Sequence, residues 1–433
     1  MEHTIGLVGS VALVVLITIG VPLAFGIGIV AIIGNVLLVG FSQTGIQLYQ
    51  VTFQTTTEFV LTSIPLFIFM GQLVSEGKLG RDLYECVHKW FGRVPGGLAV
   101  TSVVSCAAFG AMTGISSAGI STMGPIAMRE MKRYGYSDRL SSGSLASAST
   151  LAILIPPSVP FIVYGIWTDT SIGQLFMAGV VPGLFLTVLF CAYIVAVCTW
   201  NPSLGPIGHR VALRERLTSL GRLVPLIALF ASMITGLYLG WFTPAEGAAV
   251  GCAAVILILA TMGRLSWMSV TASAKTAAQL SIMIFMIVIA VQVFTRFLVL
   301  TDVPGYLISL IADAGLNRYA VLFSILMLYF FLGMMLDSLG MMLLTLPFVF
   351  PIIQHLGFDP VWFGVVLTMM VEVGLLTPPV GLNCYILNKV FPEVGLGAIF
   401  AGVIPFIILT LLSVLVFTVF PDMVLWLPKQ MFN

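Results

Sequence analysis

Glycine and hydroxyl-bearing residues gather in this sequence where an apolar helix would otherwise be expected. The segment AFGAMTGISSAGIST, residues 108–122, has eight Gly, Ser or Thr among its fifteen residues, and the pairs Pro156-Pro157 and Pro378-Pro379 interrupt other apolar segments. Carbonyl oxygens freed at such interruptions suit a small hard cation, whereas helix N-termini and hydroxyl groups suit an anionic ligand. The chemistry that these residue types favour is therefore reversible ion binding.

The surrounding chain has the composition of an integral membrane protein. Of its 433 residues, 59% are hydrophobic and 8% are charged, and the mean hydropathy is +1.12. Apolar runs longer than about 18 residues recur and strands of alternating polarity do not, which predicts an all-α polytopic fold. A net charge of +1 offers no field for nucleic acid, and the six Cys form no CxxC pair that would indicate a metal cluster.

The chain is predicted to contain two copies of one design. Shifting the sequence along itself by 222 residues aligns residues that interrupt or bend helices. The aligned pairs are Pro22 with Pro244, Ser116 with Ser338, Pro125 with Pro347, Gly135 with Gly357, and Pro156-Pro157 with Pro378-Pro379. Self-similarity at one spacing along the whole chain indicates an internal repeat.

Each copy is predicted to contain scaffold helices, a helical hairpin, a broken helix and a final helix. Repeat 1 spans 1–199, with scaffold helices in 5–75, the hairpin at 98–127, the broken helix at 139–167 and the last helix at 172–199. After a linker at 200–223, repeat 2 spans 224–420, with scaffold helices in 224–298, the hairpin at 320–350, the broken helix at 361–390 and the last helix at 395–420. A tail at 421–433 follows.

Basic residues predict that the two copies cross the membrane in opposite senses. Loops 76–97 and 128–139 hold eight Lys or Arg, whereas the equivalent loops of the second copy, 298–319 and 350–361, hold only Arg318. Lys and Arg concentrate on the cytoplasmic side, so equivalent loops lie on opposite sides of the bilayer. The linker is then cytoplasmic as well, since it carries four arginines: Arg210, Arg214, Arg216 and Arg222.

This orientation predicts a re-entrant hairpin. About 30 residues separate the first two basic loops, too few for two spans of about 20 residues each, so the segment enters and leaves on one side with its tip near Gly114–Ser117. A mirrored hairpin has its tip near Asp337. Discontinuous helices in inverted repeats form the binding sites of many secondary transporters. The alternative for an isolated stretch is close helix packing through small residues.

Four polar residues near these interruptions add side-chain oxygens. Asp337 and Glu372 are acids in apolar surroundings, where a carboxylate indicates a functional site and a structural hydrogen bond is the alternative. Thr377 and Asn383 flank the second proline pair.

These segments resemble a known family. AMTGISSAG, LAILIPPSVPFIVYG (151–165), FLGMMLDSLGMMLLTLP (331–347) and VEVGLLTPPVGLNCYI (371–386) are similar to the large membrane (M) subunit, of the DctM type, of tripartite ATP-independent periplasmic (TRAP) transporters. The resemblance covers essentially the whole chain. It implies an elevator-type secondary transporter of the bacterial or archaeal inner membrane that takes up a small organic acid, such as a C4-dicarboxylate or sialic acid, with two or more Na⁺ ions.

The resemblance also implies partners and site residues. A soluble periplasmic (P type) binding protein would deliver the substrate, and a small four-helix (Q type) membrane subunit is expected as a separate chain. One Na⁺ site would use oxygens, mostly of the main chain, from Gly110, Thr113, Ala152, Ile155 and Pro156. A second would use Gly333, Gly374, Thr377 and Val380. Substrate contacts are expected at Ser116, Ser117, Ser158, Asp337 and Asn383.

Rival functions make different demands on the sequence. GISS at 114–117 is similar to the surroundings of some intramembrane serine hydrolases, but a serine nucleophile needs a base, and the four His (His3, His88, His209 and His355) all fall in predicted loops or at the terminus. No GxxxxGK[ST] motif points to ATP. A channel, an exporter or a stand-alone ion-coupled carboxylate carrier with the same architecture remains the other alternative.

Overall fold

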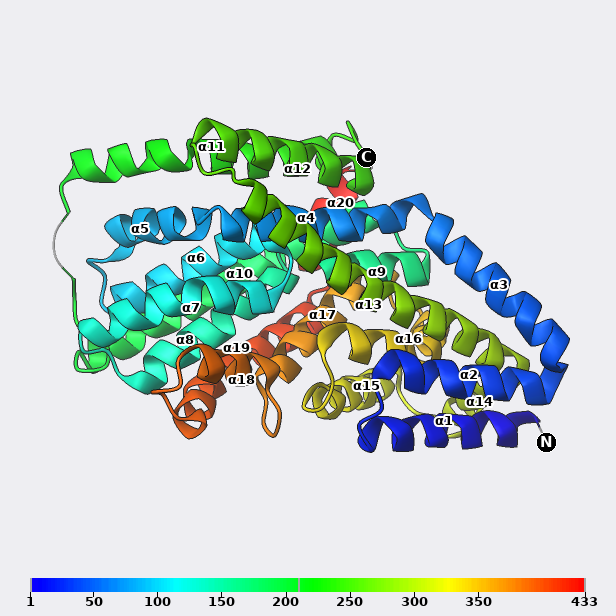
Figure 1. The fold of residues 1–433 in the computed structure, drawn as a ribbon. Coiled ribbons are helices and arrows are strands. Elements are labelled where there is room, and N and C mark those ends of the chain that lie inside the picture. The colour runs from blue at the N-terminus through cyan, green and yellow to red at the C-terminus, as the bar shows by residue number, and fades with distance from the viewer. Residues whose placement is uncertain (1, 209–210, 432–433) are drawn as a thin grey trace.

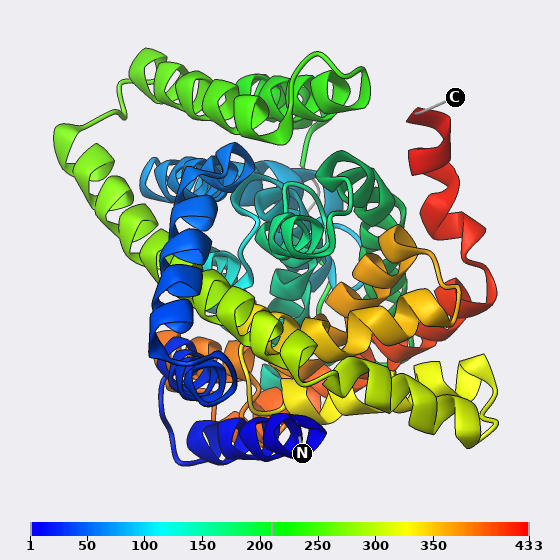
Figure 2. The same ribbon diagram turned by 90° about the vertical axis from the view of Figure 1, so that its right-hand side faces the viewer.

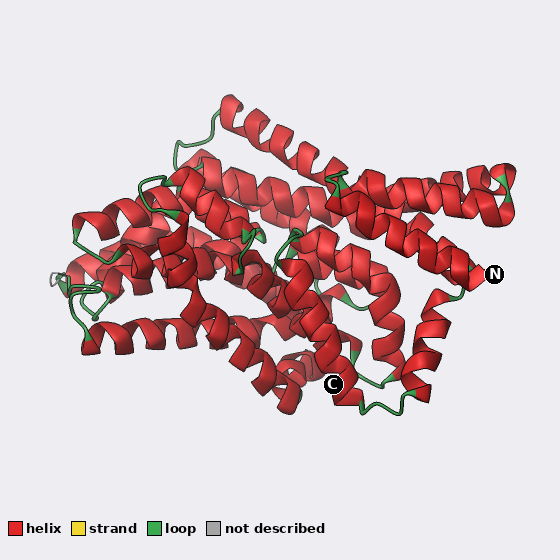
Figure 3. Cartoon of the chain, turned by 90° about the horizontal axis from the view of Figure 1, so that it is seen from below, coloured by secondary structure: helices red, strands yellow, loops and turns green. Residues whose placement is uncertain are grey.

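The chain folds into helices throughout the part that the structure describes. The computed structural model describes residues 2–208 and 211–431, and Figure 3 shows helices and loops over these ranges. Six of the described helices are long and apolar enough to span a bilayer. The chain is therefore a polytopic α-helical membrane protein, as its composition predicts. Arg210 of the predicted linker and His209 lie outside the described residues.

The described residues of the first half form ten α-helices. They are α1 (Glu2–Thr18), α2 (Leu23–Val39), α3 (Phe41–Thr57), α4 (Ser63–Glu76), α5 (Leu79–Phe91), α6 (Gly97–Thr113), α7 (Ser116–Arg133), α8 (Asp138–Thr150), α9 (Val159–Thr168) and α10 (Ile172–Trp200). Two short 3₁₀ turns, η1 (Phe59–Thr62) and η2 (Leu151–Ile153), precede α4 and follow α8. The Gly/Ser-rich segment is thus two helices, α6 and α7, joined at Gly114 and Ile115.

The described residues of the second half also form ten α-helices. Its helices are α11 (Leu213–Tyr238), α12 (Pro244–Thr261), α13 (Trp267–Leu300), α14 (Val303–Asp313), α15 (Arg318–Gly333), α16 (Ser338–His355), α17 (Pro360–Leu376), α18 (Leu382–Val390), α19 (Leu396–Val419) and α20 (Asp422–Met431). The hairpin α15–α16 corresponds to α6–α7, and the pair α17–α18 corresponds to α8–α9.

Several predicted loops are helices in the structure. α3, α5, α14 and α20 occupy segments expected to be loops or tail, and α11 and α13 begin about ten residues before the predicted spans. α5 shows the reason, because it buries Leu83, Tyr84 and Val87 on one side and exposes Arg81 and Glu85 on the other. Such a helix is amphipathic rather than apolar all round, so a search for long hydrophobic runs passes over it.

Two groups of helices are distinguished by their contacts. α13 crosses the molecule obliquely in Figures 1 and 2 and packs against α2 and α4, while α4 also packs against α12. The hairpins and broken helices pack with α10 and α19 in a separate bundle, in which α8 contacts both α6 and α19. We call the group α1–α4 with α11–α13 the scaffold, and the group α6–α10 with α15–α19 the bundle.

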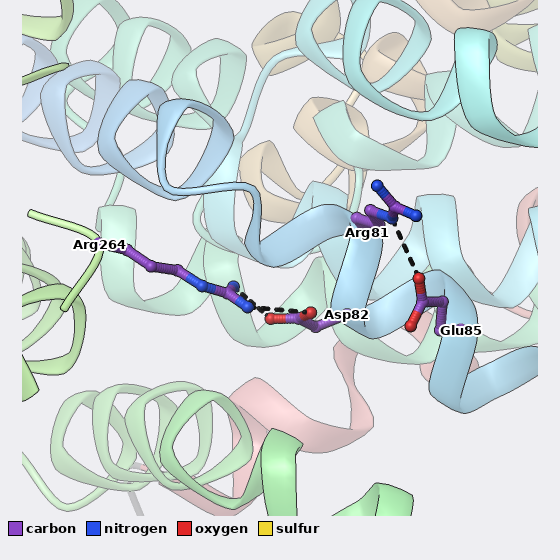
Figure 4. A network of polar contacts seen from close by, with 4 residues as sticks. All are labelled: Arg81, Asp82, Glu85 and Arg264. Atoms are coloured by element: carbon purple, nitrogen blue, oxygen red, sulfur yellow. Dashed lines mark hydrogen bonds and ion pairs between the residues drawn. The ribbon is translucent and has the colours of Figure 1, made fainter. Parts of the chain in front are cut away.

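Polar segments from distant parts of the chain meet in space. Arg264, between α12 and α13, forms an ion pair with Asp82 of α5, beside the Arg81–Glu85 pair in Figure 4. Hydrogen bonding to Asp82 raises the pKa of the Arg264 guanidinium. The linker packs on the loops before α6 and α8. The Gly96 N–H donates to the Gly205 carbonyl at 3.1 Å, and the Ser137 N–H donates to the Leu204 carbonyl at 3.0 Å. These segments therefore share one side of the molecule.

The closest packing within the bundle lies between α8 and α19. A Cβ atom added to Gly143 would overlap the main chain of Gly402, and one added to Gly402 would overlap the Arg139 carbonyl. Small residues allow such direct backbone contact between membrane helices. The contact joins the predicted first repeat to the last helix of the second.

Gly402→Ala is expected to destabilise the protein. The added methyl group must push α19 away from α8, and overpacking of this kind costs about 1–3 kcal/mol. Gly397→Ala, on the same helix with nothing within 4 Å of its added Cβ, is the matched control. Thermal unfolding of the purified proteins in one detergent measures the difference. Equal midpoints for the two variants would contradict direct contact between α8 and α19.

Candidate functional site

The first hairpin turns against the first broken helix. Gly114, between α6 and α7, has φ +63°, and its N–H donates to the Gly110 carbonyl at 2.8 Å. A Cβ on Gly114 would overlap the Pro157 carbonyl oxygen, so the tip has room only for glycine. α7 then begins at Ser116 with no side chain capping its first N–H groups. These N–H groups are free to receive an anionic ligand.

The two breaks share their local conformation. Pro156-Pro157 and Pro378-Pro379 are both cis, and each separates the two halves of a broken helix. In the first break, Ser158 accepts a hydrogen bond from Phe161 N–H at 3.4 Å and its hydroxyl donates to the Ile153 carbonyl at 2.5 Å. The Ser158 side chain is therefore occupied within the break and fully buried.

Residues of the first predicted Na⁺ site come together at the main chain. A Cβ on Gly110 would lie 2.5 Å from the Cα of Ala152, so α6 and η2 touch at these two residues. Thr113 is buried one turn later and its hydroxyl donates to the Phe109 carbonyl at 3.3 Å. Ile155 and Pro156 are also buried, in the segment that follows η2.

Residues of the second predicted site meet in the same way. A Cβ on Gly374 would lie 2.5 Å from the Cα of Gly333, which brings α17 against the end of α15. Thr377 N–H donates to the Gly374 carbonyl at 3.2 Å, and the Thr377 hydroxyl donates to the Val373 carbonyl at 2.6 Å. Val380 is exposed, and its N–H donates to the Met334 carbonyl at 3.3 Å.

A cavity of about 780 Å³ lies between the two hairpin tips and the scaffold. The tips contribute Ser116, Ser117 and Asp337, three of the five predicted substrate contacts. Asp337 caps α16 by accepting a hydrogen bond from Gly340 N–H at 3.3 Å, and it is the one charged residue that lines the cavity. Ser158 does not line it.

Asn383 acts behind the cavity wall. Its Oδ1 accepts a hydrogen bond from the Ser116 hydroxyl at 3.3 Å, and its Nδ2 donates to the Ser149 hydroxyl at 3.2 Å. It is fully buried and does not line the cavity. Asn383 therefore ties the tip of the first hairpin to α8 and α18.

The scaffold side of this cavity was not predicted from the sequence. That wall is formed by residues 22–25 at the start of α2 and by Leu280, Ile282, Met283, Ile284, Met286 and Ile287 of α13. These side chains are almost all apolar, so their residue types do not distinguish them from other membrane-helix residues in the sequence. Their spacing along α13 is the one feature of the sequence that could indicate a shared surface, because residues three and four apart lie on the same face of a helix.

The arrangement offers no support for a serine hydrolase. The hydrogen-bond partner of Ser116 is an asparagine, and His88 and His355 lie on α5 and at the end of α16, away from the residues that line the cavity. Within the described ranges, no group of three or more His, Cys, Asp or Glu could hold a metal ion. The residues predicted to bind Na⁺ would offer mostly backbone carbonyls.

Broken helices and facing hairpin tips around one cavity in a polytopic helical protein define the class of secondary membrane transporters. The family model of the tripartite ATP-independent periplasmic transporter, DctM component, matches residues 10–423, and the chain belongs to this family. It is thus a large permease component of a TRAP transporter, and its relatives are transporter components and not enzymes.

Curated relatives carry different substrates in their names. The chain is 33% identical to the C4-dicarboxylate TRAP transporter large permease protein DctM of Pseudomonas aeruginosa, over 87% of this chain and 88% of that protein. It is 29% identical to the ectoine/5-hydroxyectoine TRAP transporter large permease protein UehC of Ruegeria pomeroyi, over 97% of this chain and 98% of that protein. The sialic acid permease SiaM of Vibrio cholerae is 28% identical, over 95% of each chain.

Two solved structures share the fold. The YdaH transporter of Alcanivorax borkumensis superposes with a TM-score of 0.61 and 16% identity, covering 90% of each chain. MtrF of Neisseria gonorrhoeae superposes with a TM-score of 0.55 and 14% identity, covering 86% of this chain and 83% of that chain. Both are similar in architecture alone.

Asn383→Leu is expected to loosen the first hairpin. The change keeps a side chain of similar size but removes the acceptor of the buried Ser116 hydroxyl, at a cost of about 1–3 kcal/mol. The Ser149 hydroxyl loses the hydrogen bond that it accepts from Asn383 but still donates to the Ala146 carbonyl at 2.6 Å. Ser117→Ala serves as the comparison, because Ser117 lines the same cavity on the same hairpin. A lower thermal midpoint for Asn383→Leu than for Ser117→Ala would confirm the role of Asn383, and the reverse order would contradict it.

Proposed function

We propose that this chain carries out Na⁺-coupled uptake of a small organic acid across a bacterial or archaeal inner membrane. A soluble periplasmic binding protein would deliver the substrate, and a small four-helix membrane subunit would associate as a separate chain. The observation that carries the proposal is the paired geometry, in which each hairpin packs its main chain on one broken helix and both tips face one cavity. The relatives named for dicarboxylate and sialic acid support an organic acid as cargo.

The main-chain contacts suit a monovalent cation. Gly110 on Ala152 and Gly333 on Gly374 bring two backbones together at points where helices end. Carbonyl oxygens at such ends are hard, neutral ligands, which suit Na⁺ better than a transition metal. Gly110 and Ala152 would bind one ion with Thr113, and Gly333 and Gly374 would bind the second with Thr377.

The cavity suits the anionic end of the substrate at the first hairpin. The uncapped N-terminus of α7 presents main-chain N–H groups beside the Ser116 and Ser117 hydroxyls. Helix N-termini stabilise carboxylates through these donors and through the helix dipole. Ions bound at the two neighbouring sites would add positive charge to a cavity that no Lys, Arg or His lines.

Alternating access would follow from movement of the bundle against the scaffold. A second basin, of about 870 Å³, is lined by residues of α3, η1 and the α9–α10 turn, together with Thr243 and Pro244. At the repeat spacing of 222, its Pro244 and Val60–Leu61 correspond to Pro22 and Ile282–Met283, which line the cavity at the tips. The scaffold thus presents related walls twice, as an elevator-type carrier with inverted repeats requires.

Reconstitution tests this function. The chain, its small subunit and a panel of binding proteins in proteoliposomes are expected to accumulate an organic acid only with an inward Na⁺ gradient, and not with K⁺. Gly110→Val or Thr377→Leu should lower Na⁺-driven uptake by about tenfold or more, since each disturbs carbonyls that would bind the ion.

The Gly397→Ala protein is the control for insertion and yield. An uptake rate that does not depend on Na⁺ in the wild type or in any variant would contradict the coupling. Uptake without any binding protein would favour the stand-alone carrier.

A further inference from the structure

Polar side chains line the cavity only at the two hairpin tips. Of the described residues that line it, four have polar side chains: Ser116 and Ser117 of the first hairpin, and Asp337 and Ser338 of the second. The lining residues of the scaffold and of the broken helices are all apolar. The cavity therefore offers hydrogen bonds to one part of a bound molecule and apolar contacts to the rest of it.

The scaffold wall presents adaptable apolar side chains. Met283, Met286 and Ile287 of α13 lie three or four positions apart and so share one helix face, and Phe25 of α2 lines the same cavity. Met283 is 46% exposed and Met286 is 45% exposed, so a bound molecule can cover both side chains. Methionine is flexible and polarisable, so this wall can adjust to apolar groups of different shape.

The second basin shows that the boundary between scaffold and bundle is not apolar everywhere. Its lining includes Glu58, Asp169 and Gln292, together with several threonines. Gln292 belongs to α13, the same helix that carries the apolar wall. The apolar wall is therefore a local feature of this cavity and does not follow from the hydrophobic composition of the chain alone.

The cavity provides no positive side chain for a second carboxylate. Its described lining contains no Lys, Arg or His, and its one charged residue, Asp337, is an acid. The Ser116 hydroxyl already donates to Asn383 at 3.3 Å, so the tips have few donors to spare. A second carboxylate, or a row of sugar hydroxyls, would lose water against the apolar wall without gaining partners, which is unfavourable.

We propose that the cargo is an organic acid with one carboxylate and an apolar body, such as a branched aliphatic acid, and that Met283 and Met286 form the surface that recognises this body. The inference rests on the proposed function, in which the first hairpin holds the carboxylate. The apolar body then extends across the cavity to α13, and burial of its surface supplies binding free energy. Dicarboxylates and sugar acids gain less from this wall, because their polar groups must give up water there.

Three six-carbon acids test this inference on the purified chain with its small subunit. 4-Methylpentanoate has one carboxylate and an apolar body, adipate has two carboxylates, and gluconate has one carboxylate and several hydroxyls. Thermal unfolding is followed in Na⁺ as each acid is added, because a ligand that binds the folded state raises the midpoint. 4-Methylpentanoate is expected to give half-maximal stabilisation at a concentration about tenfold or more below that of the other two acids.

Three methionine substitutions separate the wall from general effects. Met283→Gln places a polar amide on the wall at similar side-chain length, and should raise the half-maximal concentration of 4-methylpentanoate by about tenfold. Met283→Leu keeps the wall apolar and should stay close to the wild type. Met268→Gln makes the same chemical change near the start of α13, at a side chain that is 79% exposed and does not line the cavity, and should leave the response unchanged.

The outcomes distinguish this inference from the proposed function. Equal or stronger stabilisation by adipate or gluconate, or no stabilisation by 4-methylpentanoate, would overturn the inference. It also fails if Met283→Gln responds as Met283→Leu does, or if Met268→Gln shifts the response equally. Na⁺-driven uptake of a dicarboxylate or a sugar acid by the reconstituted chain would leave the proposed function standing while the inference fails. If no organic acid is taken up with Na⁺, both fail together.

Discussion

Main-chain groups that leave a helix inside a membrane need other partners, and this requirement organises the structure. The tip at Gly114 packs against the carbonyl of Pro157, and Val380 N–H at the second break bonds to the Met334 carbonyl at the other tip. Each hairpin is thus stabilised by a broken helix, and each broken helix by a hairpin. The carbonyl oxygens left over at these junctions are the groups that ion binding would use.

Much of this arrangement could be predicted because proline and glycine residues, which end or bend helices, can be recognised directly in the sequence. The repeat spacing, the proline breaks and the hairpin at 98–127 follow from such residues, and the structure places helix ends at Thr113, Thr150 and Leu376. Helices such as α5 were not predicted because they are short and amphipathic, and so contain no long hydrophobic run. The charged residues of α5 are typical of a loop, although one face of this helix is well buried.

The site was predictable only where residue type carries a signal. Three of the predicted substrate contacts, Ser116, Ser117 and Asp337, line the cavity. Asn383 instead accepts a hydrogen bond from Ser116 outside the cavity lining, and the Ser158 hydroxyl donates to the Ile153 carbonyl within its own break. The scaffold wall on α13 is apolar and gave no chemical signal. Relatives of similar identity are named for a dicarboxylate, ectoines and sialic acid, so the shared fold does not select the cargo.

The central claim is that the two hairpins enter the membrane from opposite faces. Arg133 at the base of the first hairpin and Gln354 at the base of the second are both exposed, so single cysteines there can be labelled. In oriented membranes, an impermeant thiol reagent is predicted to reach Arg133→Cys only from the cytoplasmic side and Gln354→Cys only from the periplasmic side. Labelling of both positions from the same side would contradict the account.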